Sequence, residues 1–209
     1  AFRWVECDTD GDGIPDDWET NGVPYTNADG TQGRYILDSN GDGVSDANWL
    51  RKDIFVEVDA MAGLAPSQNA IDSVVLAFDR TGLGTNPAVP APAVPGGLPG
   101  IALHVVVDQG DQNIPPSPYT GFTEFQIDKN GSTYGFGTDN ERSDTANWPF
   151  IREARRQVFR YCIFAQNYDA GGSSGLAETP GNDFMVTLGL WPTPGGTDAE
   201  QAGTFMHEL

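Results

Sequence analysis

The sequence has few basic residues, few cysteines and no long apolar run. Its 11 Lys and Arg stand against 30 Asp and Glu, which gives a formal net charge of -19 at pH 7. This charge excludes nucleic acid as a partner, because phosphate binding needs a basic face, and it argues equally against an anionic membrane surface. No segment approaches the roughly 20 apolar residues of a membrane-spanning helix, so we expect no membrane insertion. A basic-then-apolar start is also missing, so a signal peptide is either absent or already removed.

Only two cysteines occur, Cys7 and Cys162, and they lie far apart in the sequence. Two interpretations stay open. Either both thiols are free and buried, or one disulfide ties the acidic N-terminal segment to the core. The disulfide would suit an oxidising compartment.

Acidic residues are what the chain has in excess, and they are not spread evenly. Between Asp8 and Asp59 they concentrate in loops rich in Asp, Asn and Gly, which indicates carboxylates gathered for hard cations. The 11 Phe, 5 Trp and 6 Tyr supply bulk for a packed core, and the 26 Gly and 15 Pro favour loops. At 209 residues we expect one sizeable domain and a small appendage.

Residues 8–19 match a twelve-residue calcium-binding loop, in which alternate residues direct oxygen atoms to one point. Gly13 stands where such a loop turns sharply and needs the positive φ that glycine adopts without strain. The alternative is a solvent-exposed loop that is merely rich in Asp and Gly, but here every ligand position is filled. The predicted calcium ligands are Asp8, Asp10, Asp12, the carbonyl of Ile14, Asp16 and Glu19.

A second loop repeats this design thirty residues later. Its last position holds Trp49, which cannot coordinate, so the site is weaker, is completed by water, or takes a carboxylate from elsewhere, with Asp53 as a candidate. The flanks are too short for the long helices of an EF-hand, and the pair resembles the tandem calcium repeats of thrombospondin type 3 or dockerin-like segments. Without a cation such loops repel themselves and should be disordered. The predicted ligands are Asp38, Asn40, Asp42, the carbonyl of Val44 and Asp46.

Strand and helix patterns alternate along the rest of the chain, which predicts an α/β (α+β) fold. The expected strands cover residues 54–59, 101–108 and 184–191, with a shorter one over 123–127 followed by a turn over 128–131. The expected helices cover residues 69–80, capped by Ser67, and 147–167, with a Pro-rich surface loop over 81–100.

Three further features are interpreted from local context. Four arginines lie on the expected long helix, at 152, 155, 156 and 160, and should form a solvated face that pairs with nearby acids. His104 lies within a strand, where a lone histidine is more often a hydrogen-bonded structural residue than a ligand. Asp108 ends that strand, and it either caps or coordinates.

The last stretch predicts a helix that starts at a capping box, Thr197 to Glu200, and brings His207 and Glu208 side by side. His-Glu is the first half of the His-Glu-x-x-His pattern, in which the histidines bind zinc and the glutamate is the general base. The alternative is an ordinary helix in which the two residues happen to be adjacent.

This stretch, residues 181–189, the strand region 51–59 and the calcium-type loops together resemble secreted bacterial zinc metalloproteases of the zincin type, in particular metzincins. The resemblance implies a zincin-like mixed, twisted sheet with packed helices. Residues 51–209 would be the N-terminal part of the catalytic domain, preceded by a calcium-loop segment over residues 1–50.

The resemblance also implies a chemistry. His207 would bind Zn²⁺, Glu208 would be the catalytic base, and two calcium ions would be structural. A protein or peptide substrate would add to an edge strand over residues 181–187, at Gly181, Asp183 and Met185. We expect an extracellular location, as for secreted enzymes of this type.

The family supplies two more zinc ligands beyond the first histidine, and neither occurs in these 209 residues. We therefore expect hydrolysis by a longer parent chain and none by this portion alone. The alternative function is a calcium-stabilised extracellular adhesion or filament module without catalysis.

Overall fold

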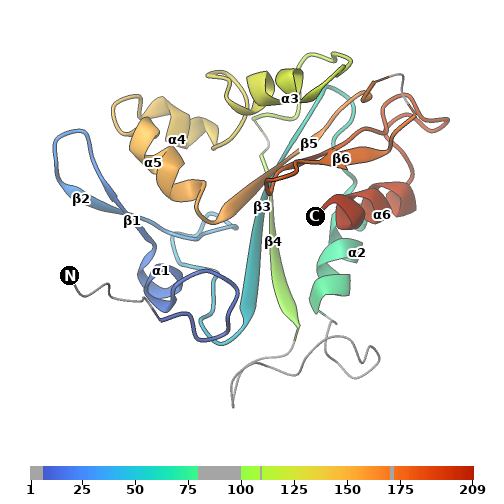
Figure 1. Cartoon of the computed structure of the whole chain (residues 1–209). Coiled ribbons are helices and arrows are strands. Elements are labelled where there is room, and N and C mark those ends of the chain that lie inside the picture. The colour runs from blue at the N-terminus through green and yellow to red at the C-terminus, as the bar shows by residue number, and fades with distance from the viewer. Residues whose placement is uncertain (1–6, 80–99, 109, 170–171) are drawn as a thin grey trace. The chain divides into compact units, whose positions relative to one another are not determined.

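The computed structural model describes residues 7–79, 100–108, 110–169 and 172–209 (Figure 1). The expected Pro-rich loop lies almost wholly outside them. The chain forms two compact units of three segments each. Unit 1 holds residues 1–55, 75–104 and 145–159, and unit 2 holds residues 56–74, 105–144 and 160–209. The expected division at residue 50 stays a prediction.

The fold is α/β, as predicted. Five strands form one mixed sheet in the order β4-β3-β5-β7-β6, and two short strands form a separate hairpin. β5 and β7 run parallel, and β6 pairs antiparallel with β7. The strands of the sheet are β3 (Lys52–Ala60), β4 (Ile101–Val107), β5 (Phe159–Phe164), β6 (Gly175–Ala177) and β7 (Phe184–Val186).

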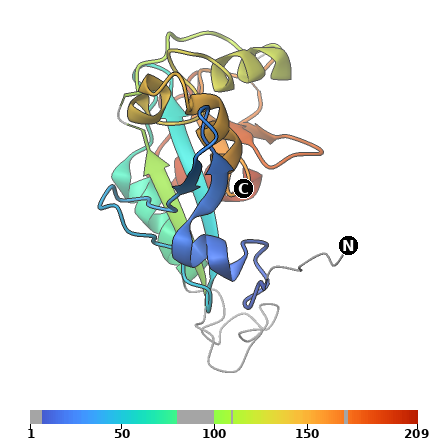
Figure 2. The ribbon, with the colours of Figure 1, turned by 90° about the vertical axis from the view of Figure 1, so that its left-hand side faces the viewer.

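Among its described residues, unit 1 contains the hairpin, two whole helices and the end of a third, residues 75–79. Figure 2 shows α5 beside the hairpin, against which it packs. Gly22 joins α1 to the hairpin with φ at 84°, and an added Cβ would lie 2.5 Å from the carbonyl oxygen of Tyr35, so this corner requires glycine. The elements are α1 (Asp16–Asn21), β1 (Val23–Thr26), β2 (Gln32–Tyr35) and α5 (Trp148–Arg155).

Unit 2 packs aromatic side chains between its strands and helices. Phe205 of α6 meets Phe184 of β7 edge to face at 5.2 Å between ring centroids, and Phe125 of α3 lies 5.7 Å from the ring of Tyr161. No helix of the described residues is long and apolar enough to span a membrane. The helices of this unit are α3 (Phe122–Lys129), α4 (Asp139–Ser143), α6 (Asp198–Glu208) and the first part of α2 (Gln68–Asp79).

The helix expected over residues 69–80 is confirmed as α2, and the Ser67 Oγ accepts a hydrogen bond from the Ala70 amide at 3.1 Å. The helix expected over 147–167 is wrong in its second half. It ends at Arg155, and β5 begins at Phe159. Five of the six residues of β5 are buried, so apolar residues stand on both faces of the strand and fit a helical period equally well.

Two further expectations fail. Residues 123–127 form part of helix α3 and not a strand, and Glu124 accepts a hydrogen bond from the amide of Gly121 to close its N-terminus. Arg155 is not on a solvated face. It is 2% exposed, and its guanidinium carbon lies 4.0 Å from the centre of the Phe159 ring, a cation–π contact.

A buried ion pair joins α3 to the start of β7. The Lys129 Nζ donates to Asp183 Oδ2, and each residue is 5% exposed. The other oxygen, Asp183 Oδ1, accepts from the backbone amide of Tyr161 at 2.8 Å. Loss of one partner leaves the other charge buried and unpaired, which is the costly outcome for such pairs.

We expect Lys129→Met to lower the free energy of unfolding by about 3–5 kcal/mol, measured by urea denaturation in saturating calcium. The double variant K129M/D183N should recover much of the loss, because Asn can still accept from the Tyr161 amide while no charge is left unpaired. Equal destabilisation by the single and double variants would show that Lys129 acts through packing and not through its charge.

Candidate functional site

The loop over residues 8–19 is shaped by its own carboxylates. Asp8 accepts hydrogen bonds from the amides of Gly11 and Gly13, at 2.8 and 3.1 Å. Asp16 accepts from the amide and the hydroxyl of Thr9, both at 2.7 Å. Gly13 has φ at 98°, the positive value expected at the sharp turn. Asp8 and Asp16 therefore hold the backbone of the loop, and the other acids converge elsewhere.

Four carboxylates meet in unit 1 and form what we call the loop cluster. One oxygen from each lies within 4.8 Å of the others. Three of the four residues are almost fully buried, at 4%, 1% and 3% exposure for Asp10, Glu19 and Asp53. The members of the loop cluster are Asp10, Asp12, Glu19 and Asp53.

Three oxygens of the loop cluster lack hydrogen-bond donors. Asp10 Oδ2 and both carboxylate oxygens of Glu19 are buried without a partner. Burial, then the charges of Asp10 and Asp12, raise the pKa of Glu19 to about 9. Burial, then the charge of Asp12, raise the pKa of Asp10 to about 6. The negative charge of these gathered carboxylates must be balanced by protons or by a cation. Hard oxygen donors of this kind suit Ca²⁺.

Asp53 was predicted, as a candidate, to close the second loop, and here the prediction is wrong because Asp53 completes the first. Its amide donates to Asp12 Oδ2 at 2.7 Å, and its Oδ2 accepts from the amide of Asn48 at 2.8 Å. His104 Nε2 lies 2.6 Å from Asp53 Oδ1, and its ring stacks on Phe55 at 4.3 Å. His104 is thus the hydrogen-bonded structural residue that was expected, and it orients a cluster carboxylate.

The second loop has the same local turns but no gathered carboxylates. Asp38 accepts from the amides of Gly41 and Gly43, at 2.6 and 2.7 Å, and Asp46 accepts from Ser39. Among the described residues, Asp38, Asp42 and Asp46 do not converge within 4.8 Å. Ser45 of this loop donates to the carbonyl of Glu19 at 2.5 Å, so the loop supports the first site. A second calcium ion here stays a prediction.

Helix α6 begins at the predicted capping box. The Thr197 side chain accepts from the amide of Glu200, and Glu200 Oε2 accepts from the amide of Thr197 at 2.7 Å. Gln201 fixes the first turn by donating to the carbonyl of Gly195 at 2.9 Å. Phe205 packs into the core and His207 on the following turn is exposed, so the helix presents its imidazole to solvent.

Glu208 lies against strand β6. An added Cβ on Gly175 would lie 2.9 Å from Glu208 Oε1, so the carboxylate packs closely against this strand. Burial raises the pKa of Glu208, while the charge of His207 and the Ala177 amide lower it. In the part of the chain that the structure describes, neither His207 nor Glu208 belongs to a group of three potential metal ligands.

The predicted edge strand is wrong. β7 lies between β5 and β6, so the edge belongs to β6. Asp183 and Met185 are buried, and Asp183 is held by Lys129, so neither side chain can contact a peptide; Gly181 lies in an exposed turn. β6 gives little sequence signal, because a three-residue Gly-Leu-Ala segment has no strand period.

The predicted disulfide is also wrong. Cys7 and Cys162 are free thiols, the first exposed and the second buried. Cys162 stands on β5 opposite Phe184, and burial raises the pKa of its thiol well above the ordinary value. The alternative of two free, buried thiols is also wrong in one part, because Cys7 is exposed.

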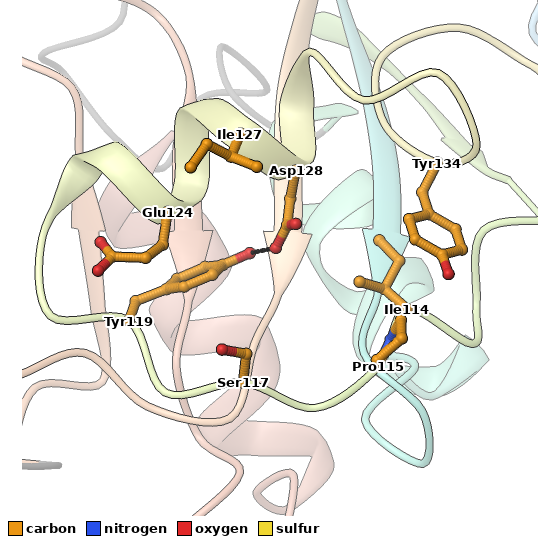
Figure 3. A pocket seen from close by; sticks show the side chains of 8 residues that line it. All are labelled: Ile114, Pro115, Ser117, Tyr119, Glu124, Ile127, Asp128 and Tyr134. Carbon is orange, nitrogen blue, oxygen red and sulfur yellow. Dashed lines mark hydrogen bonds between the residues drawn. The ribbon is translucent and has the colours of Figure 1, made fainter.

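A pocket of about 280 Å³ opens in unit 2 (Figure 3). The Tyr119 hydroxyl donates to Asp128 Oδ2 at 2.5 Å within it. None of the predicted site residues lines this pocket. The lining residues are Ile114, Pro115, Ser117, Tyr119, Glu124, Ile127, Asp128 and Tyr134.

Comparison of the chain with protein-family models, with curated proteins and with solved structures gives no match.

We expect Glu19→Gln to weaken calcium binding at the loop cluster by at least about 10-fold, because it removes a buried charged ligand. Isothermal titration with CaCl₂ measures the change. Glu153→Gln, on an exposed side chain of the same unit, is the matched control and should bind as the parent does. Unchanged affinity in E19Q would remove Glu19 from the site.

The calcium-free protein should lose stability as pH rises. The pKa of Glu19 is raised from 4.5 to about 9 on folding, so its contribution is fully present below pH 4.5 and is lost as pH rises through about 9. The slope for one proton is about 1.4 kcal/mol per pH unit. Urea midpoints in EDTA between pH 5 and 9 test this. Saturating calcium should abolish the decline, and a midpoint in EDTA that rises with pH contradicts it.

Proposed function

We infer that the chain belongs to a secreted, zinc-dependent endopeptidase, with His207 as a zinc ligand and Glu208 as general base. One observation carries this proposal. Glu208 lies against β6, the edge strand of the sheet, with its Oε1 2.9 Å from the place of a Cβ on Gly175, beside an exposed imidazole. The proposed base, the proposed metal ligand and a strand edge are thus adjacent.

The direction of the backbone groups on β6 supports this. The carbonyl of Ser174 accepts from the amide of Thr187, and the amide of Glu178 donates to the carbonyl of Asp183. Both groups therefore face β7. Alternate residues of a strand direct their backbone groups to opposite sides, so the Ala177 amide faces the open edge. An extended peptide adds to such an edge through its main chain. The Glu208 carboxylate lies beside this edge.

Glu208 also has suitable acid–base properties. A general base is most effective when its pKa lies near the working pH, and burial raises the pKa of this carboxyl toward that range.

The residues fit zinc only in part. Catalytic zinc takes three protein ligands, and His207 is the one imidazole on this helix. The other histidine of the sequence, His104, is bonded to Asp53. When bound, zinc would supply an activated water, but these 209 residues do not complete its coordination.

The second candidate function is a calcium-stabilised extracellular module without catalysis. The loop cluster favours it, since Asp10, Glu19 and Asp53 offer buried carboxylates for calcium without any residue of α6. Calcium at this site also suits the peptidase, in which it would be structural. The two functions therefore differ only in catalysis.

In the full-length protein, Glu208→Gln should lower kcat for cleavage of a denatured protein by about 10²–10⁴-fold without lowering the zinc content. His207→Ala should lower the zinc content itself. Hydrolysis assays and elemental analysis, both in saturating calcium, measure these effects.

Met206→Ala is the matched control, because Met206 is an exposed neighbour on the same turn, at 46% exposure. It should retain activity. Full activity of E208Q would exclude Glu208 as the base. Calcium binding without zinc and without hydrolysis in the parent protein would leave the module as the function.

A further inference from the structure

Unit 2 contains a second group of buried carboxylates, which we call the core cluster. Glu57 and Asp59 alternate on β3 and therefore point to the same face of the strand. Asp108 follows β4, and its amide donates to the carbonyl of Val58 at 3.0 Å. The three residues are 0%, 0% and 7% exposed, and one oxygen from each lies within 4.8 Å of the others.

Part of the core cluster is held by hydrogen bonds. Glu57 accepts from the amide of Gly137, at 2.7 and 3.0 Å to its two oxygens. Asp59 Oδ2 accepts from the hydroxyl of Tyr161 at 2.8 Å, and Asp108 Oδ1 accepts from the amide of Gly110 at 2.9 Å. These bonds fix the carboxylates in place.

Two oxygens remain without any hydrogen-bond partner. Asp59 Oδ1 and Asp108 Oδ2 are fully buried and unsatisfied. A buried carboxylate with an unpaired oxygen is among the most costly groups in a folded protein. These two oxygens are the observation that requires a ligand here.

One described basic side chain, Arg142, interacts with the charge of Asp108, but its ion pairs are with other acids. Arg142 pairs with Asp111 and Asp139, each at 2.7 Å. Either protons or a further cation must therefore offset the charge.

The spacing suits a cation. Calcium lies about 2.3–2.6 Å from its oxygen ligands, so two oxygens on one ion are at most about 5 Å apart. The oxygens of the core cluster fall within that limit, and all are hard donors, which excludes a preference for zinc or copper.

We propose that Glu57, Asp59 and Asp108 form a buried site for a hard divalent cation of the calcium type. The ion would join β3 to the end of β4, and through the Asp59–Tyr161 hydrogen bond it would connect to β5. It would stabilise the interior of unit 2, and this does not depend on the peptidase proposal.

The test uses a background variant, D10N/E19Q/D38N, that removes the loop cluster and the second loop. Thermal unfolding is measured in EDTA and in CaCl₂, and bound calcium is counted by elemental analysis after gel filtration. The background should keep one bound ion and a rise in Tm with calcium. Adding D59N/D108N should abolish both, and should raise Tm in EDTA because two like charges are removed.

Asp72→Asn is the matched control in the same unit, since Asp72 is exposed on α2, and it should leave the calcium response intact. If the background does not fold, Asp108→Asn alone in the otherwise native chain should lower the calcium count by one. A background without bound calcium and without a calcium-dependent Tm overturns the proposal, and protons then balance the core cluster.

Discussion

The constraint on which this structure depends is the charge of carboxylates that are removed from water. Asp53, Glu57 and Asp59 all lie on β3, and each is at most 3% exposed. A strand in a sheet core normally carries apolar residues on both faces. Three acids there are tolerated only if protons, cations or hydrogen-bond donors neutralise them. The buried, unpartnered oxygens of Glu19, Asp59 and Asp108 show where hydrogen bonds do not suffice. The cations proposed for these clusters would therefore couple metal binding to folding.

The sequence predicted the loop cluster as far as its ligands are local. Asp10, Asp12 and Glu19 are found together because a tight loop with glycines at fixed offsets brings alternate residues to one point. Asp53 could not be assigned in the same way, because its place depends on how β3 passes the loop. The same holds for the core cluster. The alternation of Glu57 and Asp59 is visible in the sequence, but the approach of Asp108 from β4 is a tertiary contact.

The errors in secondary structure have a related cause. Residues 147–167 change from α5 to β5 within a continuous apolar pattern, and burial of β5 on both faces removes the alternation that marks a strand. The prediction of a strand over residues 123–127 failed for a different reason. Helix α3 buries only Phe125 and Lys129, so its apolar stripe is too weak to show a helical period. By contrast, the capping box of α6 was predictable, because Thr197 and Glu200 satisfy each other's amides within one turn.

The edge strand β6 requires glycine at position 175 because the end of α6 packs against it. Position 175 faces Glu208, and any side chain there would displace the carboxylate, since even a Cβ would stand 2.8 Å from Glu208 Cγ. With glycine at this position, the carboxylate packs directly against the three-residue strand. The contact protects an exposed edge against adventitious pairing. Under the proposed function, a peptide strand added at this edge would lie beside the Glu208 carboxylate, so the same packing that covers the edge would set the distance between base and peptide.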